Sequence, residues 1–208
     1  MAGWSRHEGR AVALPLDNVD TDQLIPARFM SAPRAEGYGQ FLLHDLRRDA
    51  DGVPESAFPL NRHKDATVLI VGKNFGSGSS RESAVYALVD AGIRVVVAPS
   101  FGDIFAANAV NNGLLPAQIA TRATEELSEV LGDKALPAQV DLEAGKISLL
   151  TKFIDFELDE SWRAKLINGW DDIDLTLQHR DAIATYRNRR RADFGWALRQ
   201  TDPENMRR

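Results

Sequence analysis

The central part of the chain alternates two kinds of apolar pattern, and this alternation constrains the fold more than any other feature. Thr67–Val71 is a β-branched apolar run that stops at Gly72, and Ile93–Ala98 is a second apolar run. Apolar residues recur at helical spacing in Arg81–Ala91 and again in Asp103–Val110. Short apolar runs bounded by glycine are typical of buried strands. Strand, helix, strand, helix with short connections therefore predicts a parallel βαβ unit.

Weaker patterns surround this centre. Val12–Leu16 could form a short strand, and apolar residues alternate on either side of Ala144-Gly145-Lys146, which predicts a hairpin. Helices are expected at Trp162–Asn168, closed by Gly169, and at Asp181–Arg191. The prediction is an α/β fold with a central parallel βαβ unit and antiparallel additions.

Length and composition favour one domain over residues 1–208, since 44% of the residues are hydrophobic. Residues 31–64 are rich in Gly, Pro, Asp and Arg and lack long apolar runs. A loop this long inside a domain is usually functional or mobile, so we expect a mobile functional region here.

Charge argues against some partners. The net charge of -5 disfavours nucleic acid, whose binding depends on Lys and Arg neutralising phosphates. The chain has no apolar run near the ~20 residues that span a bilayer, and Met1–Arg10 has no apolar signal core. We therefore expect a cytoplasmic protein that binds neither nucleic acid nor membrane.

The exception to the acidic balance is a basic tail at residues 187–208. Its arginines are Arg187, Arg189, Arg190, Arg191, Arg199, Arg207 and Arg208. They are interpreted either as a solvated helix end beside the negative end of the helix dipole or as a docking surface for an acidic partner.

The sequence contains no cysteine. This excludes disulfides, thiol nucleophiles, zinc–thiolate sites and any iron–sulfur cluster held by this chain through thiolates. No metal ligands are predicted.

A glycine- and serine-rich segment, Asn74–Glu82, follows the first predicted strand and opens the first predicted helix. Amides at a helix start lack intrahelical partners and favour an anion. Gly76 and Gly78 permit close backbone approach to a ligand, and the planar fork of Arg81 suits a carboxylate or phosphate. The pattern lacks the Gly-Lys-Ser/Thr ending of a P-loop, the third glycine of a dinucleotide fingerprint, and the Gly-x-Ser-x-Gly of a nucleophile elbow. The alternative is structural, with Ser79 or Ser80 capping the helix and Glu82 assisting.

Several separated motifs occur in a fixed order along the chain, namely Asn18–Pro26, Gly76–Glu82, Val95–Phe105, Asn111–Pro116 and Leu175–Ile183. In this order they resemble the aconitase swivelling domain, a β/β/α fold. The first and last of them look like the small subunits of isopropylmalate dehydratases. The resemblance runs from about Arg10 to Arg187.

The resemblance implies roles for individual residues. Ser79 matches the general base, while Ser80 and Arg81, beside Gly78, match the substrate-binding group. Asp22 matches an active-site acid, although a turn aspartate bonding its own backbone is the alternative. Arg34 is the nearest candidate for a second carboxylate-binding arginine, with a spacing from Asp22 that departs by one residue from the family pattern. Ser83 also departs, because the family usually has His there.

The resemblance also implies the chemistry and the partner. The family dehydrates 2-isopropylmalate and rehydrates it to 3-isopropylmalate in leucine biosynthesis, with a [4Fe–4S] cluster as Lewis acid. Because this chain has no cysteine, the cluster is expected on a large subunit, in a heterodimer or heterotetramer, with the site at the interface. Residues 31–64 are then expected to contribute to substrate specificity, with Met30–Gly39 deciding the pocket for the substrate side chain. Two alternatives stay open: a related hydro-lyase of the homoaconitate, citramalate or dimethylmalate type, and a non-catalytic anion-binding module.

Overall fold

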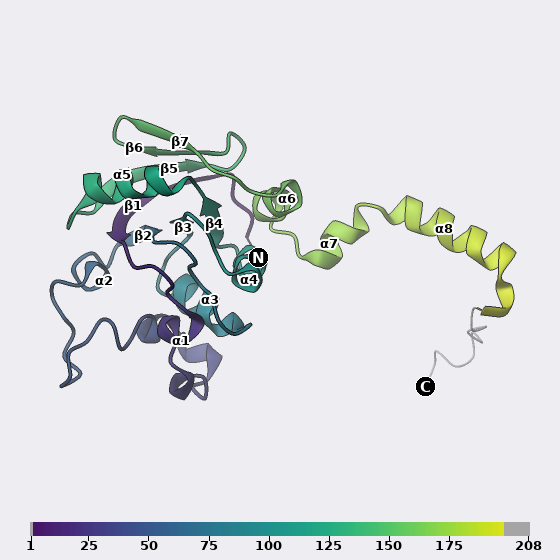
Figure 1. The fold of residues 1–208 in the computed structure, drawn as a ribbon. Coiled ribbons are helices and arrows are strands. Elements are labelled where there is room, and N and C mark those ends of the chain that lie inside the picture. The colour runs from purple at the N-terminus through teal and green to yellow at the C-terminus, as the bar shows by residue number, and fades with distance from the viewer. Residues whose placement is uncertain (1, 198–208) are drawn as a thin grey trace. The chain divides into compact units, whose positions relative to one another are not determined.

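The computed structural model describes residues 2–197, and a seven-stranded sheet is its central element (Figure 1). The strands are β1 Arg6–Leu14, β2 Ala66–Val71, β3 Val95–Ala98, β4 Leu115–Gln118, β5 Leu136–Asp141, β6 Lys146–Leu149 and β7 Lys152–Asp155. The α-helices are α1 Thr21–Leu24, α2 Pro59–Arg62, α3 Glu82–Asp90, α4 Asp103–Asn111, α5 Thr121–Leu131, α6 Glu160–Asn168, α7 Asp172–Leu177 and α8 Arg180–Asp193. Short 3₁₀ helices cover Ala27–Phe29, Arg34–Glu36, Gly39–Phe41 and Gly195–Ala197.

The sheet has a parallel half and an antiparallel half. Its strand order is β4-β3-β2-β1-β5-β6-β7. Strands β1 to β4 pair in parallel. Strand β5 pairs antiparallel with β1, β6 with β5, and β7 with β6. The predicted βαβ unit is confirmed as β2-α3-β3, and the predicted hairpin is β5-β6.

Both faces of the parallel half are apolar, which explains the uninterrupted β-branched runs. In β2, Leu69 and Val71 belong to one core and Val68 and Ile70 to the other. Helix α3 supplies side chains to the first core and α5 to the second, on opposite faces of the sheet (Figure 1). Each fully buried Val, Leu or Ile contributes roughly 1.5–3 kcal/mol relative to exposure.

Strand β1 begins at Arg6, whereas the predicted strand began at Val12. Residues Arg6–Ala11 pair antiparallel with β5, and from Arg6 to Arg10 they alternate between exposed and partly buried positions. Only the last four residues are continuously buried, and these pair with β2. The sequence pattern therefore indicated the parallel half of β1 and missed its antiparallel half.

Residues 31–64 contain only short helices, turns and an isolated bridge, as the sequence predicted. Side chains from this region nevertheless enter the core, namely Tyr38, Leu42, Leu43 and Leu60. The region is therefore attached to the core at several points, and its mobility stays a prediction.

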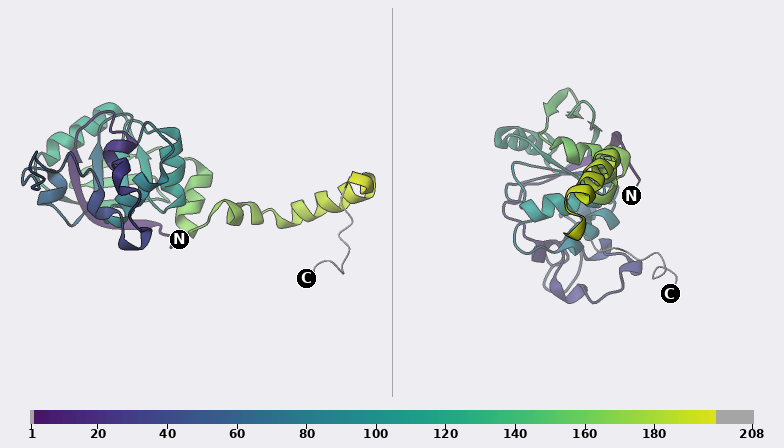
Figure 2. Two further views of the ribbon diagram at one scale, coloured as in Figure 1. Left: turned by 90° about the horizontal axis from the view of Figure 1, so that it is seen from below. Right: turned by 90° about the vertical axis from the view of Figure 1, so that its right-hand side faces the viewer.

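The chain divides into two compact units, the first ending at Asp171 and the second beginning at Asp172. In the second unit, α7 and α8 follow one another along the chain (Figure 2). Neither helix has a buried residue. Ile183 and Tyr186 on α8 are exposed. A single domain over residues 1–208 stays a prediction, and Arg199, Arg207 and Arg208 lie outside the described residues. No described helix is both long and apolar enough to cross a membrane.

His7, half-buried on β1, gives the first test. Its Nε2 lies 2.8 Å from Oγ1 of Thr67, and burial, followed by the charge of Arg94, lowers the pKa of His7 below 6.5. A lowered folded-state pKa means that the unfolded chain binds the proton more readily. The contribution to stability is present above pH 6.5 and is lost as the pH falls through the lowered value.

We therefore expect His7→Gln to flatten the pH dependence of the unfolding free energy between about pH 7 and about pH 5. Chemical denaturation at several pH values measures this pH dependence. His63→Gln, at the C-cap of α2, is the control. An unchanged slope in His7→Gln would contradict the assignment.

Candidate active site

Two loops meet at the carboxyl ends of β1 and β2, where ligands bind in open α/β sheets. The amide of Gly76 donates to the carbonyl of Val19 at 2.7 Å, and the amide of Thr21 donates to the carbonyl of Ser77 at 2.9 Å. Asp20 and Ser77 thereby form a parallel bridge. Segments almost sixty residues apart in sequence are thus held together by backbone hydrogen bonds.

The two glycines of the serine loop serve different purposes. Gly76 has φ +73°, and a Cβ there would lie 2.2 Å from the ring of Phe105 on α4. Gly78 has φ +95° and is exposed, and a Cβ there would meet nothing closer than 3.5 Å. Gly76 therefore packs the loop against α4, whereas Gly78 gives a left-handed turn on an open surface.

Ser79 and Ser80 are exposed and do not cap α3. The N-cap residue of α3 is Arg81, which makes no side-chain cap hydrogen bond. The capping alternative for these two serines is therefore wrong. Both side chains precede the helix at its positive end, the position that the anion-binding interpretation requires.

The buried hydroxyl of Thr21 contacts both the side chain and the backbone of Ser79. Its Oγ1 lies 3.1 Å from Oγ of Ser79 and 3.2 Å from the Ser79 carbonyl oxygen, while Thr21 itself is 1% exposed. A buried hydroxyl with these two partners restricts both the backbone and the side chain of Ser79. The sequence interpretation missed Thr21, although its place between the two aspartates of Asp20-Thr21-Asp22 marked it for attention.

Asp22 and Arg81 form an ion pair with Nη1 and Oδ1 2.5 Å apart. Nη1 also donates to the carbonyl of Ile25 at 3.3 Å. The Arg81 side chain is only 16% exposed, so its guanidinium is held in place. The capping turn expected of Asp22 is made by Asp20, whose carboxylate accepts from the Gln23 amide at 2.7 Å.

Arg34 is not part of this cluster. Its Nη1 and Nη2 lie 2.5 and 2.9 Å from the carboxylate oxygens of Asp90, the last residue of α3. Ser79 and Arg81 lie at the other end of this nine-residue helix, about 13 Å away along its axis. The structure thus brings together Asp22, Gly78, Ser79, Ser80 and Arg81 and leaves Arg34 elsewhere.

The described residues offer no metal site of their own. Within residues 2–197, no group of three or more His, Asp or Glu side chains could hold a metal ion. The sequence also has no cysteine. These side chains therefore do not fit an iron–sulfur cluster.

Comparison with known proteins decides the family. Residues 1–122 match the aconitase C-terminal domain, and residues 172–200 match the C-terminal domain of the 3-isopropylmalate dehydratase small subunit. The chain is 46% identical over 188 residues to the 3-isopropylmalate dehydratase small subunit of Shouchella clausii, covering 89% of this chain and 95% of that protein. It belongs to this small-subunit family. The small subunit of Shewanella amazonensis is 45% identical over 195 residues, covering 91% of this chain and 97% of the relative.

A solved structure agrees with the fold. The crystal structure of 3-isopropylmalate dehydratase from Methanocaldococcus jannaschii matches with a TM-score of 0.63 and 28% identity, covering 88% of this chain and 99% of that one. The predicted aconitase-type α/β fold is therefore confirmed. So is the predicted enzyme class, a hydro-lyase of leucine biosynthesis. The named relatives favour isopropylmalate over the other substrates that the sequence left open.

Ser83, the departure from the family pattern noted in the sequence, is buried in the first turn of α3. Its Oγ has no hydrogen-bond partner among the described atoms. A buried hydroxyl without a partner costs about 1–3 kcal/mol. Because its Oγ has no partner, Ser83 adds no side-chain hydrogen bond to the cluster of Asp22, Ser79 and Arg81.

The contact between Thr21 and Ser79 gives the second test. We expect Thr21→Val, which keeps the shape of the buried side chain, to lower kcat of the assembled dehydratase roughly tenfold, because Ser79 loses its hydroxyl partner. Steady-state kinetics with the large subunit present measure this change. Thr124→Val on α5 is the matched control, since that threonine is also buried and its hydroxyl bonds a carbonyl at 3.3 Å. Equal kcat for both variants would exclude the role of Thr21.

Proposed function

We propose that Ser79 is the general base of the dehydratase and that Ser80, Arg81 and Gly78 bind a carboxylate of the substrate. The observation that carries this proposal is the contact network that joins Thr21 to Ser79 and Asp22 to Arg81. In this network a serine hydroxyl, an arginine and a helix start lie within one small region. The substrate class is a small 2-hydroxy dicarboxylic acid, 2-isopropylmalate.

A serine is a weak base unless its alkoxide is stabilised. Three features of the site favour the alkoxide of Ser79. The single O–H of Thr21 donates to the Ser79 carbonyl and can turn to Oγ of Ser79, 3.1 Å away, when that oxygen is an alkoxide. The positive end of α3 and the guanidinium of Arg81 add favourable electrostatics. In the reaction the alkoxide takes the proton from the carbon next to a carboxylate and becomes the neutral hydroxyl.

Arg81 is suited to orient that carboxylate. A guanidinium has five N–H donors, and the contacts to Asp22 and Ile25 both involve Nη1. The contact with Asp22 orients the guanidinium of Arg81. Its other N–H groups are therefore presented to the substrate carboxylate in a constant orientation. We propose that Asp22 acts through Arg81, as a residue that positions the carboxylate clamp.

We further propose that the site is completed by a large partner protein, which holds the [4Fe–4S] cluster. The relatives are named small subunits, which implies a large partner. Ser79 and Ser80 are exposed on this chain, whereas proton abstraction benefits from a site closed to water. A covering surface supplied by the partner would provide that closure, in a heterodimer or heterotetramer. Loss of the hydroxyl is assigned to no residue of this chain, and a cytoplasmic location stays a prediction.

The role of Ser79 is tested by Ser79→Ala in the complex reconstituted with the large subunit. We expect kcat to fall by about 10²–10⁴-fold with little change in complex formation, because a general base contributes on that order. Ser128→Ala on α5 is the matched control and should keep wild-type turnover. Near-wild-type turnover of Ser79→Ala would remove this serine as the base.

The division of labour is tested with the chain alone, purified and reconstituted with iron and sulfide under anaerobic conditions. We expect neither the visible absorbance of an iron–sulfur cluster nor isomerase activity, because thiolate ligands are absent. Addition of the cluster-loaded large subunit should restore turnover. Cluster absorbance in the isolated chain would contradict the proposal.

A further inference from the structure

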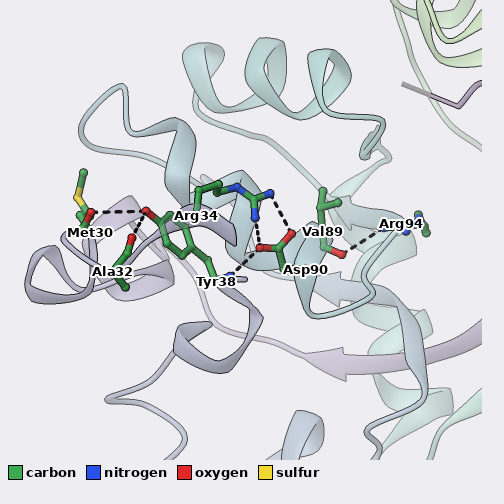
Figure 3. Close-up of polar contacts among 7 residues, drawn as sticks. All are labelled: Met30, Ala32, Arg34, Tyr38, Val89, Asp90 and Arg94. Atoms are coloured by element: carbon green, nitrogen blue, oxygen red, sulfur yellow. Dashed lines mark hydrogen bonds and ion pairs between the residues drawn. The ribbon is translucent and has the colours of Figure 1, made fainter. Parts of the chain in front are cut away.

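Asp90, at the carboxyl end of α3, fastens the loop that follows α1. Its carboxylate accepts two hydrogen bonds from Arg34, at 2.5 and 2.9 Å, and a third from the backbone amide of Tyr38 at 2.6 Å (Figure 3). The Asp90 side chain is only 17% exposed. One carboxylate thus holds two points of the loop, four residues apart.

Aromatic rings complete the attachment. The guanidinium of Arg34 lies 4.5 Å from the ring centre of Tyr86 and 5.5 Å from that of Tyr38. Burial, and then a hydrogen bond to the carboxylate of Glu82, raises the pKa of Tyr86, so the ring beneath Arg34 stays neutral. Cations stack favourably on such rings.

The loop also closes on itself. Tyr38 is 7% exposed, and its hydroxyl donates to the carbonyl of Ala32 at 3.0 Å (Figure 3). Gly39 approaches α3 so closely that a Cβ would lie 2.6 Å from the amide nitrogen of Ala91. Residues 32–39 therefore have one well-determined path against the end of α3.

The position of Asp90 is unusual for the helix itself. The carboxyl end of a helix carries partial negative charge, which disfavours a carboxylate in the last turn. Arg34 and the Tyr38 amide compensate this charge. The contacts of Asp90 thus stabilise the position of the loop. A neutral or basic residue at this position would stabilise the helix itself more.

We infer that Asp90 is a positioning residue for substrate selection, which holds residues 30–39 through Arg34 and Tyr38. This inference rests on the proposed function, in which α3 begins at the carboxylate clamp Arg81. The same helix then carries the clamp at one end and the loop anchor at the other, so their separation is fixed. Loss of the Asp90 contacts lets residues 30–39 move relative to Arg81. The space between this loop and Arg81, and with it the substrate side chain that fits there, then changes.

A competing role for Arg34 is the one expected from the sequence, direct binding of a substrate carboxylate. The two roles predict different patterns in a double-mutant cycle. If Arg34 acts through Asp90, the double variant is no worse than Asp90→Asn, and Arg34→Gln has no larger effect than Asp90→Asn, which also weakens the contact to the Tyr38 amide. If Arg34 binds substrate, Arg34→Gln has the larger effect and the double variant is worse than Asp90→Asn.

The experiment has two readouts. In the isolated chain, Asp90→Asn should raise amide hydrogen exchange of residues 30–39 on the order of tenfold, because the charged anchor is lost. In the assembled dehydratase, all three variants should lower the ratio of kcat/KM for 2-isopropylmalate to that for 2-methylmalate by roughly three- to tenfold, while kcat changes little. Asp133→Asn, which breaks the surface ion pair with Arg62 and leaves the contacts of Asp90 in place, is the control for both readouts.

Unchanged exchange in Asp90→Asn, an unchanged selectivity ratio, or an additive cycle dominated by Arg34→Gln would each overturn the inference. Failure of the proposed function looks different. It appears as an inactive wild-type complex or as full activity of Ser79→Ala, and the exchange measurement still decides whether Asp90 holds the loop.

Discussion

Backbone pairing between the loops that leave β1 and β2 is the interaction on which the rest of the site depends. The hydrogen bonds of Gly76 to Val19 and of Thr21 to Ser77 extend the parallel sheet past the end of its strands. They place Thr21 against Ser79 and Asp22 against Arg81, and hydrogen bonds accepted by the side chains of Asp17 and Asn18 join the same two loops. Since strand order alone makes β1 and β2 neighbours, the chemistry follows from the topology of the sheet.

Sequence reasoning succeeded where a pattern has a local physical cause. Runs such as Thr67–Val71 are apolar throughout because both faces of the sheet are covered, and helix α6 ends at Gly169 because that residue takes the left-handed conformation. Strand β4 was missed because it contains Pro116, which is tolerated at a sheet edge. Helix α5 was missed because its buried face consists of Thr124, Leu127 and Leu131, in which the polar threonine leaves only two apolar residues to show the helical spacing.

The candidate site was predictable only in part, because some of its contacts join residues far apart in the sequence. The resemblance pointed to Asp22, Ser79 and Arg81, and the structure joins Arg81 to Asp22 by an ion pair and to the Ser79 carbonyl by a backbone hydrogen bond. The partner of Arg34 could not be read from the sequence, because Asp90 lies 56 positions further along the chain and looks like an ordinary surface residue at a helix end. Long-range pairs of this kind are determined by the fold, and local patterns do not encode them.

The second unit has a consequence for assembly. Helix α8 has fourteen residues and buries none of them, and isolated helices of that length are marginal in water. Any association that uses Ile183, Tyr186 or the nearby arginines must therefore also bear the entropy of ordering this helix. Its affinity would then respond to alanine and glycine exchanges on the solvent side of α8, at positions that no partner touches.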